Sequence, residues 1–287
     1  MKQVEPWQLS SGSESTTRKP QSVMLSFLGI YLHGQSSAIY SGSIIDVFAR
    51  LGISVDAVRS TLTRMVSRGL LERHRRGRKM YFSVSDRGEK ILTDGYRRIW
   101  ESGAVVRNWN GNWTMVAFSL PNEGSQERHA LRSRLIWAGF GLLQPGLWVA
   151  PDELDVTGIV EETGLAEFMT VMTGQPSAPT KPSEVIERAF DLSAIANNYY
   201  EFLKEWDSLN PWSIWPDDLA RQVVLHVDWL QLVRQNPRLP ADYLPKDWPI
   251  FRAEHVFQHL AQTLEPGSKA IADATFDMIP LSQRSHD

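Results

Sequence analysis

The sequence contains no cysteine, no long apolar run and no apolar segment near its start. The first absence excludes disulfides, thiolate nucleophiles and cysteine-based metal sites. The second excludes a membrane-spanning helix, because such a helix needs about 20 consecutive apolar residues. The third removes the usual signal for secretion, since residues 1–20 are polar and rich in serine and threonine. We therefore expect a cytoplasmic protein with no membrane partner.

Catalytic motifs are also missing from the sequence. There is no glycine-rich phosphate loop, no Ser-His-Asp order and no pair of carboxylates whose spacing rises above chance. We predict no catalytic residue, no metal site and no cofactor, and therefore a protein that is not an enzyme. The chain has 287 residues, of which 42% are hydrophobic. It can bury a core and is long enough for two or three domains.

The net charge of −3 conceals two halves of opposite sign. Residues 1–150 hold 20 lysines and arginines against 11 acidic residues, whereas residues 151–287 hold 10 against 22. Thirteen of the basic residues fall between Arg50 and Arg98, with only five acidic residues among them. Chance clustering is the alternative, but this density favours a head that binds nucleic acid on a body with another role.

A short amphipathic helix is the first part of the strongest chemical signal. Ser54 is its predicted cap, and Gly69 is the predicted left-handed residue at its end. Its inward stripe recurs at intervals of three and four residues and consists of Val55, Val58, Leu62, Met65 and Val66. The residues predicted to meet bases or phosphates, on the opposite face and its flank, are Arg59, Ser60, Thr63 and Arg64.

A basic hairpin follows this helix, with two alternating strands around a tip at Arg76-Gly77. The hairpin cations predicted to contact phosphates are Arg73, Arg75, Arg76, Arg78 and Lys79. Helix followed by basic hairpin predicts a winged helix-turn-helix that binds double-stranded DNA. A solvated surface is the alternative, but so many like charges in one hairpin are unfavourable without a polyanion.

The remaining patterns predict an α+β, multidomain protein. Residues 1–20 are interpreted as a disordered tail and residues 21–102 as the winged-helix domain. Alternating strands and helices over residues 103–176 predict a central ferredoxin-like α+β domain. Residues 175–182 are interpreted as a linker, and residues 183–287 as a C-terminal helical domain.

Several predicted helices are specific enough to compare with a structure. One covers residues 41–50, with Ser41 as its cap. Another covers residues 126–140, with Leu131, Leu135 and Ile136 on its inward face. The last apolar stripe predicts a helix over residues 251–264.

Four segments resemble the PaaX-type bacterial transcriptional repressors of phenylacetate catabolism. They are LGISVDAVRSTLTRMVSRGLLERHRRGRKMYFSVSDRGEKIL, NGNWTMVAFSLP, LIWAGFGLLQPGLWVAP and NPRLPADYLPKDWP. The similarity covers nearly the whole chain after residue 20, and the later segments are more specific than a helix-turn-helix alone. The resemblance implies three domains and a homodimeric repressor. It also implies that phenylacetyl-coenzyme A, or a related acyl-coenzyme A, releases the protein from operator DNA.

The sequence departs from the family near its last signature. The family carries a histidine two positions before an aromatic residue and an arginine just after it. Here Trp229 holds the aromatic position, but Val227 and Leu230 hold the other two, and His226 is one step out of register. If those positions touch the inducer, this chain responds to a different acyl-coenzyme A or to none. Our candidates for effector contact are Arg221, His226 and Trp229, against the alternative that such residues only pack the core.

Three other interpretations stay open at this point. A ferredoxin-like domain also resembles the small CRISPR-associated adaptation nucleases, so a metal-dependent nuclease is the alternative function. Its first strand, however, leads into Ser119, Leu120 and Pro121 without a carboxylate for a metal. His255 and His259 have zinc-compatible spacing but no assignable third ligand. A DNA-binding protein without an inducer is the remaining possibility.

Overall fold

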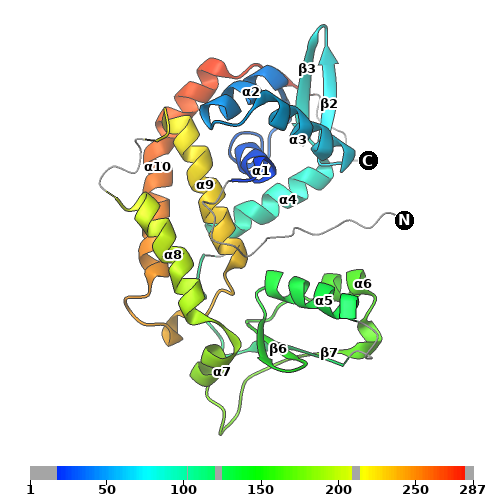
Figure 1. Cartoon of the computed structure of the whole chain (residues 1–287), viewed down its shortest axis with the longest axis vertical. Helices are drawn as coiled ribbons and strands as arrows, with labels where there is room; N and C mark the ends of the chain where they lie inside the picture. Colours follow the sequence, from blue (N-terminus) through cyan, green and yellow to red (C-terminus); the bar gives the residue numbers. More distant parts are fainter. Residues whose placement is uncertain (1–17, 102, 120–124, 209–213, 282–287) are drawn as a thin grey trace.

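The computed structural model describes residues 18–281 apart from 102, 120–124 and 209–213. Helices and two four-stranded antiparallel sheets build it, so the chain is an α+β protein of several parts (Figure 1). Over the described ranges, no helix combines the length and apolar character that crossing a membrane requires.

The first part of the chain, called the head below, spans residues 20–96. Its elements are α1 (Pro20–Tyr31), β1 (Ser37–Tyr40), α2 (Ser41–Arg50), α3 (Val55–Ser67), β2 (Leu71–Arg76), β3 (Lys79–Val84) and α4 (Asp86–Tyr96). The helix predicted over residues 41–50 is confirmed, although Ser41 is its first residue rather than its cap. Ser54 caps α3 as predicted, because its side chain accepts a hydrogen bond from the Ala57 backbone.

The apolar stripe of α3 faces the head core, with one correction. Val58, Leu62 and Met65 are buried, but Val55 is 40% exposed. Val55 is the first residue of the helix, and the core begins one turn later at Val58. The stripe is therefore shorter than predicted. The polar face opposite it is exposed to solvent.

The predicted disordered tail ends too late. Residues 1–17 lie outside the described part of the chain, but Pro20 already belongs to the first turn of α1. Arg18 makes two 2.7 Å hydrogen bonds to Asp228 and one of 2.6 Å to Glu205. Its guanidinium also lies 5.3 Å from the ring centroid of Trp215. Arg18, just before the head, is thus bound to residues 187 and 210 positions later in the sequence.

A second sheet builds the central part of the chain. Its elements are β4 (Trp113–Phe118), α5 (Ser125–Trp137), β5 (Gly141–Gln144), β6 (Leu147–Pro151), α6 (Thr157–Thr163) and β7 (Met169–Gly174). The strand order is β5-β6-β4-β7, and a core between the sheet and its two helices joins them. Ile136, predicted to face inward, is 59% exposed. Leu131 and Leu135 lie one turn apart on α5, and Ile136 is rotated about 100° from that stripe.

Helices make up most of the last part of the chain. They are α7 (Pro182–Ala189), α8 (Leu192–Trp206), α9 (Asp218–Gln235) and α10 (Pro249–Thr275). The predicted end of the last helix at residue 264 is wrong, because α10 continues through Pro266. A side chain at Gly267 would begin only 2.1 Å from the Asp218 carboxylate. The Pro-Gly pair thus marks a close approach to α9 rather than a helix end.

Helix α9 belongs to two hydrophobic cores at once. Leu219, Val223 and Val227 complete the head core together with residues of α1 to α4. Other α9 residues, among them Trp229 and Val233, belong to the core formed with α8 and α10. Figure 1 shows α9 and α10 running along the side of the head. The boundaries predicted at residues 102 and 183 therefore do not separate independent cores.

The head sheet also receives a strand from the end of the chain. Strand β8 (Met278–Pro280) pairs antiparallel with β1, which gives the order β2-β3-β1-β8. The predicted helical C-terminal domain thus ends in a strand, and the last residues of that prediction, 282–287, lie outside the described chain. Phe276, just before β8, packs edge-on against Phe27 and Tyr31 of α1.

Replacing Phe27 by alanine tests this shared core. Its ring is fully buried and contacts Phe48 and Phe276, so the cavity should lower the free energy of unfolding by about 3–5 kcal/mol. Chemical denaturation measures the change. Ile136→Ala, at an exposed position, should stay within about 0.5 kcal/mol of the wild type. Equal effects of both substitutions would contradict the assigned core.

Candidate nucleic-acid interface

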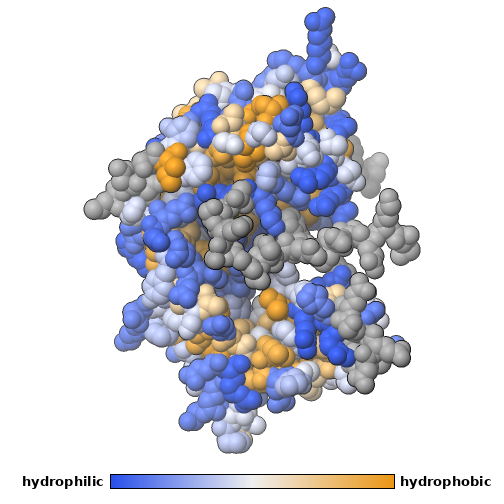
Figure 2. Space-filling view, in the orientation of Figure 1, coloured by the Kyte–Doolittle hydropathy of each residue, from blue (hydrophilic) through white to orange (hydrophobic). Residues whose placement is uncertain are grey.

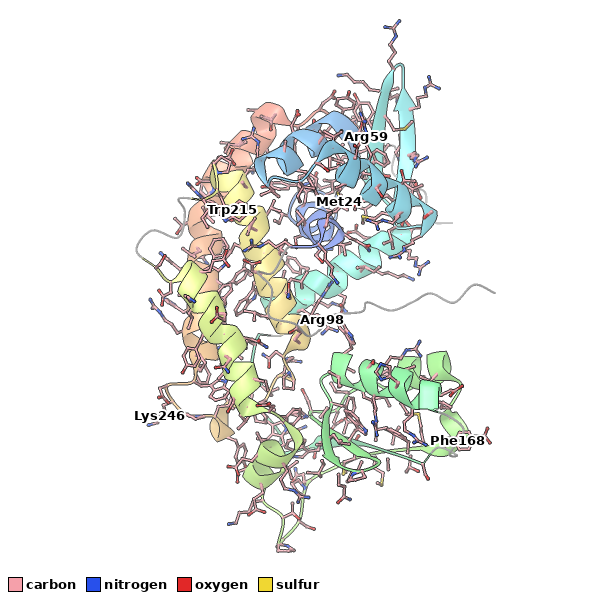
Figure 3. All side chains as sticks on the ribbon, viewed as in Figure 1. Met24, Arg59, Arg98, Phe168, Trp215 and Lys246 are labelled. Atoms are coloured by element: carbon pink, nitrogen blue, oxygen red, sulfur yellow. The ribbon has the colours of Figure 1, made fainter. Side chains whose placement is uncertain are left out.

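The polar face of α3 is presented as predicted. The predicted contact residues on this face are all exposed, and they are Arg59, Ser60, Thr63 and Arg64. Asp56 and Ser67 of α3 are exposed as well. The Arg59 side chain is 69% exposed, and its guanidinium lies 4.0 Å from Asp56 one turn earlier. Figure 3 shows Arg59 on α3, close to the β2–β3 hairpin. The four predicted contact residues offer two guanidinium groups and two hydroxyls, which are suitable donors for base edges and phosphates.

The hairpin cations lie on both faces of the β2–β3 ladder. Arg73 is paired with Phe82 and Arg75 with Met80, so each arginine lies on the same face of the hairpin as its partner. Phe82 and Met80 on this face pack against the head core. The second face carries the pair formed by Arg76 and Lys79. Gly77 supplies the positive φ of 57° that the tip requires.

The hairpin projects beyond the helices, and hydrophilic side chains cover it (Figures 1 and 2). Its four arginines are all exposed, and they are Arg73, Arg75, Arg76 and Arg78. Helix α3 and the hairpin follow each other in the chain, and their buried residues belong to the same hydrophobic core. This shared core fixes the position of the exposed arginines of α3 relative to those of the hairpin. Such an arrangement attracts a polyanion.

Lys79 differs from the hairpin arginines in having an acidic partner from the end of the described chain. Its ammonium lies 2.7 Å from the Asp277 carboxylate and 4.9 Å from the ring centroid of Tyr40. The hydrogen bond and charge of Asp277 raise the pKa of Lys79, and Lys79 in turn lowers the pKa of Asp277. In this structure Lys79 is therefore paired with Asp277, although its side chain is 52% exposed.

Ser85 positions the end of α3 relative to the hairpin and α4. Its hydroxyl donates to the Gly69 carbonyl at 2.6 Å and accepts from the Gly88 backbone at 3.0 Å. Gly69 has the left-handed φ of 68° predicted for the residue after α3. At Gly88 a β-carbon would lie 2.3 Å from the Leu70 carbonyl oxygen, so glycine permits this contact. Local hydrogen bonds thus fix the recognition face.

The structure adds residues that sequence reasoning missed. Arg68 and Arg87 are both exposed, and the Arg87 guanidinium donates to the Arg68 carbonyl at 3.1 Å. Both belong to the basic run from Arg50 to Arg98, which was the signal that could have indicated them. Asp277 had no such signal, because its contact with the hairpin joins residues about 200 positions apart.

The three candidates for effector contact lie on α9 in different surroundings. Trp229 is buried and stacks on Phe257, with ring centroids 4.7 Å apart. His226 is also buried, and its Nδ1 lies 2.8 Å from the Gln222 carbonyl. Arg221 lies near the start of α9 and pairs with Asp218 at 2.9 Å. The structure therefore places two of them inside the core and one at its edge.

The histidine pair on α10 forms no metal centre with neighbouring ligands. The rings of His255 and His259 stack with centroids 6.5 Å apart. Within the described ranges, no group of three or more potential ligands occurs. A close ion pair nearby joins Arg252 to Asp207 at 2.6 Å.

Comparison with known proteins gives matches along nearly the whole described chain. A family described as "PaaX-like protein" matches residues 19–88, and one described as "PaaX protein central Cas2-like domain" matches residues 106–186. A third, described as "PaaX-like protein C-terminal domain", matches residues 190–274. This chain belongs to the PaaX family.

Two individual proteins extend this result. "Transcriptional repressor PaaX" from Escherichia coli (strain K12) is 26% identical over 263 residues, which cover 87% of this chain and 81% of that protein. The solved structure of "Uncharacterized protein Rv0674" from Mycobacterium tuberculosis has 25% identity and a TM-score of 0.61. It covers 88% of this chain and 99% of its own. Helix α3 and the hairpin of this PaaX-family chain fall within the first matched region.

The buried His226 should make stability depend on pH. Burial lowers its pKa to about 4, against about 6.5 in an unfolded chain. Below pH 6.5 the unfolded chain gains a proton that the folded protein does not. The free energy of unfolding should therefore fall by up to about 1.4 kcal/mol per pH unit between pH 6.5 and 4.

His226→Gln should flatten this part of the pH profile, measured by denaturant unfolding at several pH values. His255→Gln, at an exposed histidine, is the matched control and should keep the slope of the wild type. Identical profiles for the His226 variant and the wild type would contradict the assignment.

Proposed function

We propose that this PaaX-family chain is a DNA-binding transcriptional repressor. The observation that carries the proposal is the exposed polar face of α3 beside a projecting hairpin with four exposed arginines. We interpret α1 to α3 and β1 to β3 as a winged helix-turn-helix. In this interpretation α3 enters the major groove, while Arg73, Arg75, Arg76 and Arg78 contact phosphates. The E. coli relative that carries the name of a transcriptional repressor supports the same role.

The chain acts as a homodimer in this proposal. Two heads related by a two-fold axis match the half-sites of an inverted repeat in operator DNA. The central part, interpreted as ferredoxin-like from its strand order, and the helical part then form the body between the heads. This division follows residues 21–102, 103–176 and 183–287, with α9 and β8 reaching back into the head.

An acyl-coenzyme A inducer, phenylacetyl-coenzyme A or a related thioester, releases the repressor in this proposal. The candidates for contact with this inducer are Arg221, His226 and Trp229. All three lie on α9, which contributes to both the head core and the core formed with α8 and α10. Since His226 and Trp229 are already packed against aromatic rings, an inducer that reaches them must shift α9 or α10. Such a shift changes the head as well.

The alternative of a metal-dependent nuclease has no supporting observation. Strand β4 ends at Phe118, and Ser119 follows it, so the described residues at this end of the strand supply no carboxylate for a divalent metal. Leu120 and Pro121 lie outside the described residues. DNA cleavage that depends on magnesium or manganese and stops with a chelator would contradict the repressor proposal.

Substitution of the hairpin arginines tests DNA binding directly. Each phosphate contact contributes about 0.9 to the slope of log affinity against log salt concentration. Arg76→Met and Arg78→Met should therefore each make the slope shallower by about 0.9 per head. Fluorescence anisotropy with a promoter duplex, repeated over a salt series, measures this. Arg252→Met, which removes an arginine of α10, should leave the slope unchanged. Failure of the wild type to bind at low salt would overturn the proposal.

Titration with coenzyme A thioesters tests release from DNA. An effector that distinguishes the two states by about 3 kcal/mol lowers DNA affinity roughly 150-fold. We expect this effect from at least one aryl- or acyl-coenzyme A thioester in a panel that includes phenylacetyl-coenzyme A. Free coenzyme A is the control and should have a smaller effect. No release by any thioester would favour a constitutive DNA-binding factor.

A further inference from the structure

Asp277 links the end of α10 to the DNA-facing hairpin. It lies between Thr275, the last residue of α10, and β8. Its carboxylate accepts hydrogen bonds from Lys79 at 2.7 Å and from the Tyr81 hydroxyl at 3.0 Å. Both donors belong to β3, the second strand of the hairpin. One acidic side chain from the end of the chain thus contacts two residues of the hairpin.

The backbone of Asp277 is fixed as firmly as its side chain. Its amide donates to the Ser43 hydroxyl at 3.0 Å, and its carbonyl accepts from the Tyr40 amide at 2.8 Å. Pairing of β8 with β1 continues this attachment, and Phe276 packs on α1 from the other side. The carboxylate is therefore delivered to Lys79 by a rigid segment rather than by a loose end.

A carboxylate and a DNA phosphate compete for the same lysine. The other four cations of the hairpin are exposed arginines, whereas the Lys79 ammonium lies between Asp277 and the Tyr40 ring. The raised pKa of Lys79 and the lowered pKa of Asp277 agree with a mutual stabilisation of the two charges. In this structure the Lys79 ammonium is thus engaged by Asp277.

We propose that Asp277 is a positioning residue that withholds Lys79 from the DNA backbone. The inference rests on the proposed DNA-binding function. While the segment between α10 and β8 keeps Asp277 against β3, each head binds phosphates without Lys79. Loss of the Asp277 charge frees Lys79 to become one more phosphate contact for that head.

The test compares the salt dependence of DNA binding in full-length variants. Asp277→Asn keeps the size of the side chain and the backbone contacts but removes its negative charge. The slope of log affinity against log salt should become steeper by about 0.9 per head, with tighter binding at low salt. A residue that only supports the fold would instead weaken binding when it is changed. Asp207→Asn is the matched control, because it removes the acidic partner of Arg252 and should leave the slope unchanged.

Lys79 provides the second arm of the test. Lys79→Met alone should leave the wild-type slope unchanged, since this lysine is withheld, and in Asp277→Asn it should cancel the steeper slope. The Lys79 arm keeps the inference testable even where the Asp277 variant fails to fold. A shallower slope for Lys79→Met, or an unchanged slope for a folded Asp277→Asn, would overturn the inference while leaving DNA binding intact. Absence of DNA binding by the wild type would overturn both proposals.

Discussion

The structure depends on the burial of α9 in two cores. An isolated amphipathic helix buries one stripe, but α9 has buried residues around much of its circumference. Leu219 and Val223 pack into the head, whereas Trp229 and Val233 pack against α8 and α10. Densely packed cores transmit displacements rather than absorb them. A change beside α9 in the later helices therefore also changes the support of α3 in the head core.

Polar contacts reinforce this union at places where the head meets the later helices. Arg50 pairs with Asp217 at the start of α9, and Arg18 joins Asp228 of α9 to Glu205 of α8. The Tyr31 hydroxyl contacts Ser268 of α10. The two arginine links join basic residues of the first half to acidic residues of the second, so the uneven charge of the two halves also serves the fold. The arginines of the hairpin are exposed, whereas Lys79 of the same hairpin pairs with Asp277 from the later chain.

Features set by neighbouring residues were predictable from the sequence, and features set by distant residues were not. The cap at Ser54, the helix over residues 41–50 and the hairpin around Gly77 follow from local hydrogen bonding and periodicity. The continuation of α10 past Pro266 does not, because contact with α9 outweighs the local helix-breaking tendency. Strand β8 has only three residues and too little pattern to distinguish it from a loop. The partner of Lys79 could not be predicted either, because Asp277 lies 198 positions away in the sequence. The exposed polar residues of α3, in contrast, were predicted individually.

The pairing of β8 with β1 joins the last strand of the chain to the first, and this bears on protein synthesis. A ribosome releases the head long before it makes α9, Phe276 and β8, all of which contribute to the head core or sheet. Until then, the apolar surfaces of α1 and α2 lack part of their cover. The nascent head must either wait incompletely folded or be shielded by a chaperone. Translation thus makes the complete head a property of the finished polypeptide, and a prematurely terminated product lacks β8 and its pairing with β1.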